Sequence, residues 1–118
     1  MAAKRRLADI ASAEWSSERA QRFSILVLDW DSTEVFWGPW TGADYDAVFG
    51  PGAPRGGYSR PVRMIVTKAQ DVNGKPLFLA EEEEQLLDEA RPEILTALGA
   101  AILKTLPGVT DQATAAKN

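Results

Sequence analysis

Neither cysteine nor histidine occurs among the 118 residues of the chain. Without cysteine there are no disulfide bonds and no thiolate nucleophile, which is typical of a protein that stays in a reducing compartment. Without histidine the chain lacks the side chain that most often acts as a general base near neutral pH. Because these two residues are also the preferred zinc ligands, we expect no metal site. No apolar run approaches the roughly 20 residues of a membrane-spanning helix.

An excess of positive charge is missing as well. The chain has 13 Lys and Arg against 17 Asp and Glu, which gives a net charge of −4 and argues against a nucleic-acid-binding surface. Lys4, Arg5 and Arg6 form a short basic cluster. An RNA or membrane tether is one interpretation of this cluster, and a solvated terminus is favoured because no aromatic residues are interleaved with it. No apolar core follows the cluster, so it does not resemble a secretory signal.

The composition is that of an ordinary globular protein, with 45% hydrophobic and 25% charged residues. A chain of this length forms one domain by default and buries roughly two thirds of its unfolded surface. We expect three parts. They are an N-terminal extension with a weak helix at residues 1–22, a single domain at 23–106, and a polar, disordered tail at 107–118.

A two-stranded hairpin opens the predicted domain. Residues 23–30 form an aliphatic and β-branched run that is typical of a strand with at least one buried face. Asp31 and Ser32 supply the turn, and residues 33–37 return as the second strand, although Asp-Ser is a weaker hairpin signal than Asn-Gly. Pro39 cannot donate a ladder hydrogen bond, so the second strand ends there or lies at an edge.

Residues 37–49 mark the place where the ribbon ends and a helix begins. Thr41 stands at the expected N-cap, and Asp44 three residues later completes a capping-box pattern. Trp40 before the cap and Tyr45 after it occupy the two positions of a hydrophobic staple. The Gly-Pro-Gly that follows this short helix ends it and opens an irregular loop.

Three further segments are predicted to be helical. Residues 59–69 favour a helix with proline in its first turn, and their β-branched content keeps a strand open as the alternative. A tight turn at 71–78 leads to an acidic helix at 79–90. Pro92 begins a last helix that runs to about Leu106 and forms an αα-hairpin with the acidic one. The predicted class is α+β, an N-terminal β-hairpin packed on four to five short helices that include a C-terminal helical hairpin.

Two sets of apolar side chains are candidates for protein binding. The first set is aromatic and surrounds the predicted helix cap: Trp37, Trp40, Tyr45 and Phe49. The second set is the stripe of the last helix: Leu95, Leu98 and Ile102. Beside this stripe, alanine and glycine leave a smooth surface that another helix could approach closely. Such a stripe serves either as core or as the interface of a homo-oligomer, and both interpretations stay open.

Motifs that suggest small-ligand chemistry are explained better by local structure. The glycine-rich stretch at 50–57 lacks the Gly-Lys-Ser/Thr of a phosphate loop, and the Asp-x-Asn at 71–73 lacks the later ligands of a calcium loop. The glutamates at 81–84 point in different directions around a helix and have no apolar enclosure. A small enzyme acting on a nucleotide or a glycan would depend on a few side chains: Asp29, Asp31, Asp44, Asp46 and Lys68. We therefore expect neither enzymatic activity nor a cofactor.

Residues 41–49 read Thr-Gly-Ala-Asp-Tyr-Asp-Ala-Val-Phe. They resemble the Thr-Gly-Ala-Glu-Arg-Asp-Ala-Phe pattern near the start of the tail assembly chaperones of long-tailed, siphovirus-type phages. The apolar segment at 62–66 and the Asp-Val-Asn-Gly-Lys-Pro-Leu-Phe at 71–78 are similar to that family's second block, in which an apolar helix leads into Asp-x-x-Gly-Lys-Pro-Leu-Phe and an acidic helix. The family usually caps the acidic helix with Ser or Thr, where this chain has Leu79 and Ala80.

The resemblance implies a protein that acts in the host bacterial cytoplasm during tail morphogenesis and is absent from the finished virion. The family is thought to bind the tape-measure protein, keep its hydrophobic helices soluble, and help recruit tail-tube subunits. A structural head–tail connector or tail-completion protein of a phage is the alternative. The resemblance further implies a longer product made by a translational frameshift, for which the Lys117–Asn118 pair permits an A-rich slippery sequence.

Overall fold

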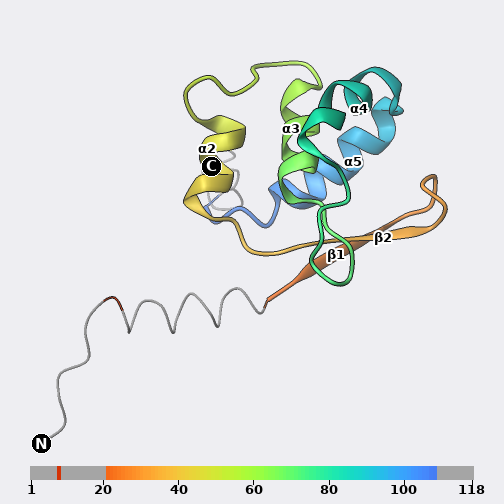
Figure 1. The fold of residues 1–118 in the computed structure, drawn as a ribbon, viewed down its shortest axis with the longest axis horizontal. Helices are drawn as coiled ribbons and strands as arrows, with labels where there is room; N and C mark the ends of the chain where they lie inside the picture. Colours follow the sequence, from red (N-terminus) through yellow and green to blue (C-terminus); the bar gives the residue numbers. More distant parts are fainter. Residues whose placement is uncertain (1–7, 9–20, 109–118) are drawn as a thin grey trace, which may run out of the picture.

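The computed structural model describes residue 8 and residues 21–108 of the chain. It begins with a hairpin of two strands and continues with helices (Figure 1): β1 (Phe23–Val27), β2 (Thr33–Trp37), α2 (Gly42–Phe49), α3 (Ser59–Lys68), the 3₁₀ helix η1 (Ala80–Glu82), α4 (Glu83–Glu89) and α5 (Pro92–Leu103). The predicted α+β class, with an N-terminal hairpin on short helices, is confirmed. The weak helix predicted within residues 1–22 and most of the tail predicted at 107–118 lie outside the described residues.

β1 and β2 form an antiparallel pair, with Phe23 opposite Trp37 at one end and Val27 opposite Thr33 at the other. The return strand therefore has the predicted bounds. Side chains alternate along the ribbon as a half-buried hairpin requires. The inner face carries Val27 and Val35, which are buried against the helices, whereas Leu26 lies on the outer face.

The turn of the hairpin is longer than predicted. The sequence predicts a first strand that continues to Trp30, and this end is wrong because the strand stops at Val27. The Trp30 amide donates to the Val27 carbonyl, and the Trp30 ring packs edge-on against Phe78 with ring centroids 5.5 Å apart. Asp31 and Ser32 close the loop with φ angles of 56° and 52°, a left-handed conformation that Asp tolerates better than most residues.

α3 is the element on which the other helices pack. α2, η1, α4 and α5 all contact it, and Figure 1 shows α3 between α2 on one side and α4 with α5 on the other. Val62 and Ile65 are fully buried on one face of α3, and Ala69 just beyond the helix is buried with them. The helix predicted for this segment is confirmed and the alternative of a strand is wrong. Val62 and Ile65 are three residues apart, so a helix places both on the face that packs against the other helices.

α5 packs closely against α3 at one glycine. A methyl group built on Gly99 would lie 3.2 Å from the Cβ atom of Pro61. Gly99 is buried at this crossing, whereas Ala97 and Ala100 are exposed. The close approach predicted for the alanine- and glycine-rich surface of α5 therefore occurs at Gly99, and the neighbouring helix is α3 of the same chain.

The segment between α3 and α4 extends the hairpin. The amide and carbonyl of Gln70 exchange hydrogen bonds of 2.8 and 2.9 Å with Phe36 of β2. The predicted tight turn follows, and its Asp71 carboxylate accepts hydrogen bonds from the amides of Asn73 and Lys75. These bonds, above all the one from Lys75, hold the pKa of Asp71 below its ordinary value.

The acidic helix begins as the short η1 and continues as α4. Leu79 and Ala80 offer no side-chain cap, and the Glu82 carboxylate accepts a 2.7 Å hydrogen bond from the Leu79 amide instead. This is half of a capping box, made from the helix side. It explains how the helix starts without the Ser or Thr that the resemblance leads one to expect.

We predict that Gly99→Leu pushes α5 away from α3 and lowers the unfolding free energy by about 1–3 kcal/mol, the usual cost of overpacking. Ala100→Leu is the matched control, because it adds the same side chain to the next, exposed position of the helix. Urea unfolding of the two variants measures the difference. Equal stabilities would mean that the α3–α5 contact is looser than described here.

Candidate functional site

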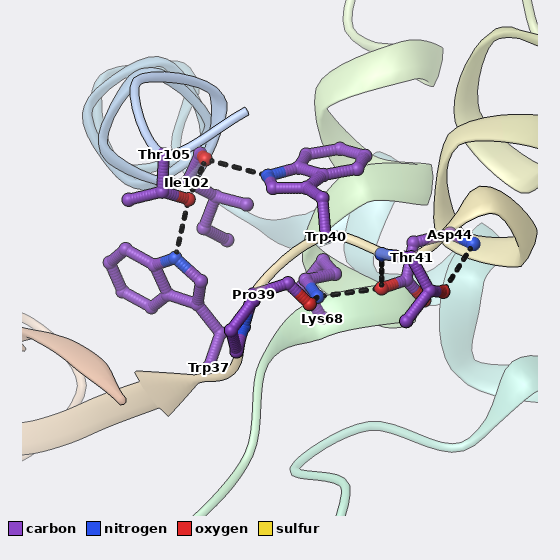
Figure 2. Close-up of polar contacts among 8 residues, drawn as sticks. All are labelled: Trp37, Pro39, Trp40, Thr41, Asp44, Lys68, Ile102 and Thr105. Carbon is purple, nitrogen blue, oxygen red and sulfur yellow. Dashed lines mark hydrogen bonds and ion pairs between the residues drawn. The ribbon is translucent and has the colours of Figure 1, made fainter. Parts of the chain in front are cut away.

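The site is built around the junction, by which we mean residues 37–44 together with the three residues they contact, Lys68, Ile102 and Thr105. At its centre is the start of α2 (Figure 2). The Asp44 amide donates to the Thr41 hydroxyl at 3.1 Å, and the Thr41 amide donates to the Asp44 carboxylate at 3.0 Å. The predicted capping box is confirmed, and it satisfies amides that the first turn of a helix leaves free.

A buried lysine ties this cap to α3. Lys68 is only 5% exposed. Its ammonium lies 2.7 Å from the Asp44 carboxylate, donates to the Pro39 carbonyl at 3.0 Å, and faces the Trp40 ring at 5.5 Å from the ring centroid. A buried ammonium is costly unless it is paired and hydrogen-bonded, and here all three kinds of partner come from the residues that precede or begin α2.

Two indoles tie the same segment to the end of α5. The Trp37 ring nitrogen donates to the Thr105 hydroxyl at 3.0 Å, and the Trp40 ring nitrogen donates to the Ile102 carbonyl at 3.1 Å (Figure 2). The Thr105 hydroxyl itself donates to that carbonyl at 2.7 Å. The last carbonyls of a helix lack partners within the helix. The bonds to the Ile102 carbonyl supply such partners, and the two indole bonds also attach the segment after β2 to the end of α5.

On the outer side of the junction lies an apolar surface, which we call the aromatic face and define as Trp40, Tyr45, Phe49 and Arg60. Phe49 lies in its middle, with ring centroids 5.0 Å from Tyr45 and 6.2 Å from Trp40. The Arg60 guanidinium lies over Phe49 at 5.0 Å from its centroid. The two residues of the predicted staple, Trp40 and Tyr45, are thus each paired with Phe49, which lies near both rings. Tyr45 is 47% exposed and available to a partner.

The structure divides the predicted protein-binding residues into two groups. Trp40, Tyr45 and Phe49 lie on the aromatic face. Four others are core residues whose side chains are covered by the chain itself: Trp37, Leu95, Leu98 and Ile102. The apolar stripe of α5 is part of the core because α5 packs on α3 and β1. Of the residues predicted to bind a protein partner, those of the aromatic face remain as candidates.

Sequence reasoning missed the role of Lys68, which it named only as a possible catalytic group. The signal was present, because Lys68 falls three residues after Ile65 and one before Ala69, on the apolar face of α3. Of the other candidates for catalysis, Asp44 is occupied by this ion pair, and Asp31 and Asp46 are exposed. In the part of the chain that the structure describes, no three side chains gather as metal ligands, and no helix there is long and apolar enough to cross a membrane.

The fold is thus a small α+β class in which a hairpin is joined through a capped helix to a helical group. No family model matches the chain, and no curated protein matches it. Among solved structures, the chain is similar to the tail assembly chaperone of bacteriophage HK97 with a TM-score of 0.55. The two share 16% sequence identity over 86% of this chain and 97% of that one. At this identity the likeness establishes a common fold, the fold that the resemblance of residues 41–49 and 71–78 implies.

We predict that Asp44→Ala destabilises the fold by about 3 kcal/mol, because it leaves the buried ammonium of Lys68 without its carboxylate. Thr41→Ala is the control, since it removes the other half of the capping box, at about 1 kcal/mol, and keeps the ion pair. Losses of equal size in urea unfolding would show that the cap matters and the ion pair does not.

Proposed function

We propose that this protein is a tail assembly chaperone of a long-tailed phage. The observation that carries the proposal is the likeness to the HK97 chaperone, which spans 97% of that chain. The two sequence motifs that resemble the family also support the proposal, because each of them forms a defined element of this fold. Residues 41–49 form the capped α2, and residues 71–78 form the turn that leads into η1.

In this proposal the chain binds the tape-measure protein, keeps its apolar helices in solution, and helps recruit tail-tube subunits in the host cytoplasm. A protein with this task needs an exposed apolar surface for its client and an exterior that resists aggregation. Tyr45 of the aromatic face, which is exposed, provides the first. The net charge of −4 provides the second.

A chaperone of this kind is used during assembly and leaves no copies in the particle, unlike a head–tail connector. Mass spectrometry of purified virions therefore distinguishes the two, and abundant copies of this chain would contradict the proposal. The proposed frameshift product is tested separately by the coding DNA. An A-rich slippery heptamer that contains the codons for Lys117 and Asn118 supports it, and a Lys117 codon ending in G with no other repetitive heptamer nearby contradicts it.

Co-expression with a neighbouring large coiled-coil protein, the expected client, tests the proposed activity. We expect that coiled-coil protein to be soluble with the chain and insoluble without it. Tyr45→Ala should reduce the soluble fraction several-fold, because it removes an aromatic contact that a partner would bury. The soluble fraction is measured by centrifugation and quantitative gel electrophoresis.

Tyr58→Ala is the matched control for Tyr45→Ala. Tyr58 is the same residue with a similar exposure, 43% against 47%, and it precedes α3 instead of lying on the aromatic face. Tyr58→Ala should leave the unfolding free energy within about 0.5 kcal/mol of the original chain, and Tyr45→Ala should lower it by about 0.5–1.5 kcal/mol because it removes the ring contact with Phe49. Insolubility of the coiled-coil protein in the presence of the unmodified chain would refute the function, and equal effects of the two variants would refute the role of the aromatic face.

A further inference from the structure

A second surface lies away from the junction, in a groove of about 450 Å³ between the hairpin loop and α4. Its floor is apolar and consists of Trp30, Leu77, Phe78 and Leu86. Trp30 and Phe78 hold each other in a T-shaped contact, so the floor is formed before any partner arrives. A preformed apolar floor is a common property of sites that accept side chains from another molecule.

The rim of the groove is acidic. Glu82 and Glu89 line it together with Gln85, and none of its lining residues in the described chain is basic. The Gln85 amide donates to the Glu89 carboxylate at 2.8 Å, and among residues 21–108 no lysine or arginine pairs with that carboxylate. Elsewhere on this helical segment, Glu83 is already paired with Arg63. Glu82 and Glu89 therefore place negative charge at the edge of the groove, whereas Glu84 carries its charge outside the groove lining.

We propose that this groove binds an amphipathic helix of a partner protein, with apolar side chains on the floor and Lys or Arg against the acidic rim. An apolar groove that receives one face of a helix is an established mode of peptide recognition. A small ligand fits less well, because the polar groups stand at the rim and do not converge on the floor. The negative charge of the rim favours a partner helix with positive charge, since like charges across an interface are unfavourable.

A second copy of the chain does not offer such a helix within residues 21–108. α3 is the described helix with several basic residues, Arg60, Arg63 and Lys68, and its apolar face is buried in the core. Since residues 21–108 of a second copy offer no such helix, the groove is assigned to a helix of a different chain. The inference rests on the proposed function in one respect only, namely that the client of a tail assembly chaperone is the expected source of the helix.

The first test uses synthetic helical peptides of about 18 residues, long enough to form a helix in water. One peptide has leucine on one face and lysine on the other, and the second has glutamate in place of lysine. Isothermal titration calorimetry with the full chain measures the dissociation constants. We expect the lysine peptide to bind and the glutamate peptide not to bind, and equal binding of the two would overturn the proposal.

Three variants of α4 locate the binding. Glu89→Lys reverses a rim charge and should weaken binding of the lysine peptide roughly tenfold. Gln85→Glu adds a carboxylate to the rim and should strengthen binding, a gain that misfolding cannot produce. Glu84→Lys is the matched control, because it makes the same charge change at an exposed position of α4 that does not line the groove. Equal weakening by Glu84→Lys and Glu89→Lys would show attraction to an acidic helix in general and overturn the proposal.

A peptide with the sequence of residues 1–20, which contains Lys4, Arg5 and Arg6, distinguishes a second occupant. Tighter binding of this peptide than of the lysine peptide would assign the groove to the chain's own segment and overturn the proposal. The outcome is separable from that of the chaperone assay. If the unmodified chain keeps the coiled-coil protein soluble while Glu89→Lys leaves peptide binding unchanged, the groove proposal fails and the function stands.

Discussion

The structure depends on the burial of one positive charge. The ammonium of Lys68 is buried at the end of α3. It is stable there because it donates hydrogen bonds to the Asp44 carboxylate and the Pro39 carbonyl. Those partners belong to the segment that follows the hairpin and to the first turn of α2. One charge therefore fixes the end of the ribbon, the start of α2 and the end of α3 at the same point, and the Trp37 and Trp40 indoles add the end of α5.

Much of this arrangement could be predicted from short-range patterns. The capping box of Thr41 and Asp44 uses residues three apart, so it is visible in the sequence and has the predicted form in the structure. The hairpin and the helix of residues 59–68 follow from patterns of similar length. Tertiary packing decided the features that differ. Trp30 continues an apolar run and reads as strand, yet it turns away to contact Phe78, a residue far along the chain.

The candidate site was less predictable for the same reason. An apolar stripe on a helix looks alike whether the chain or a partner covers it, and Leu95, Leu98 and Ile102 are covered by the chain. Tyr45 remains on the surface because α2 is short and only Val48 on it is buried, whereas Phe49 is half-buried against the core. The groove beside α4 combines the hairpin loop with residues near position 80, and no local pattern indicates that these two regions meet.

If the junction holds the molecule together, the hairpin and the helices should open as one unit. Native-state hydrogen exchange at low denaturant tests this most directly, by comparing the amide of Val35 in β2 with those of Ile65 in α3 and Ile102 in α5. We expect opening free energies for all three that agree within about 1 kcal/mol and converge on the global unfolding free energy. A Val35 amide that exchanges through a much smaller opening free energy, with Ile65 and Ile102 still protected, would contradict this expectation.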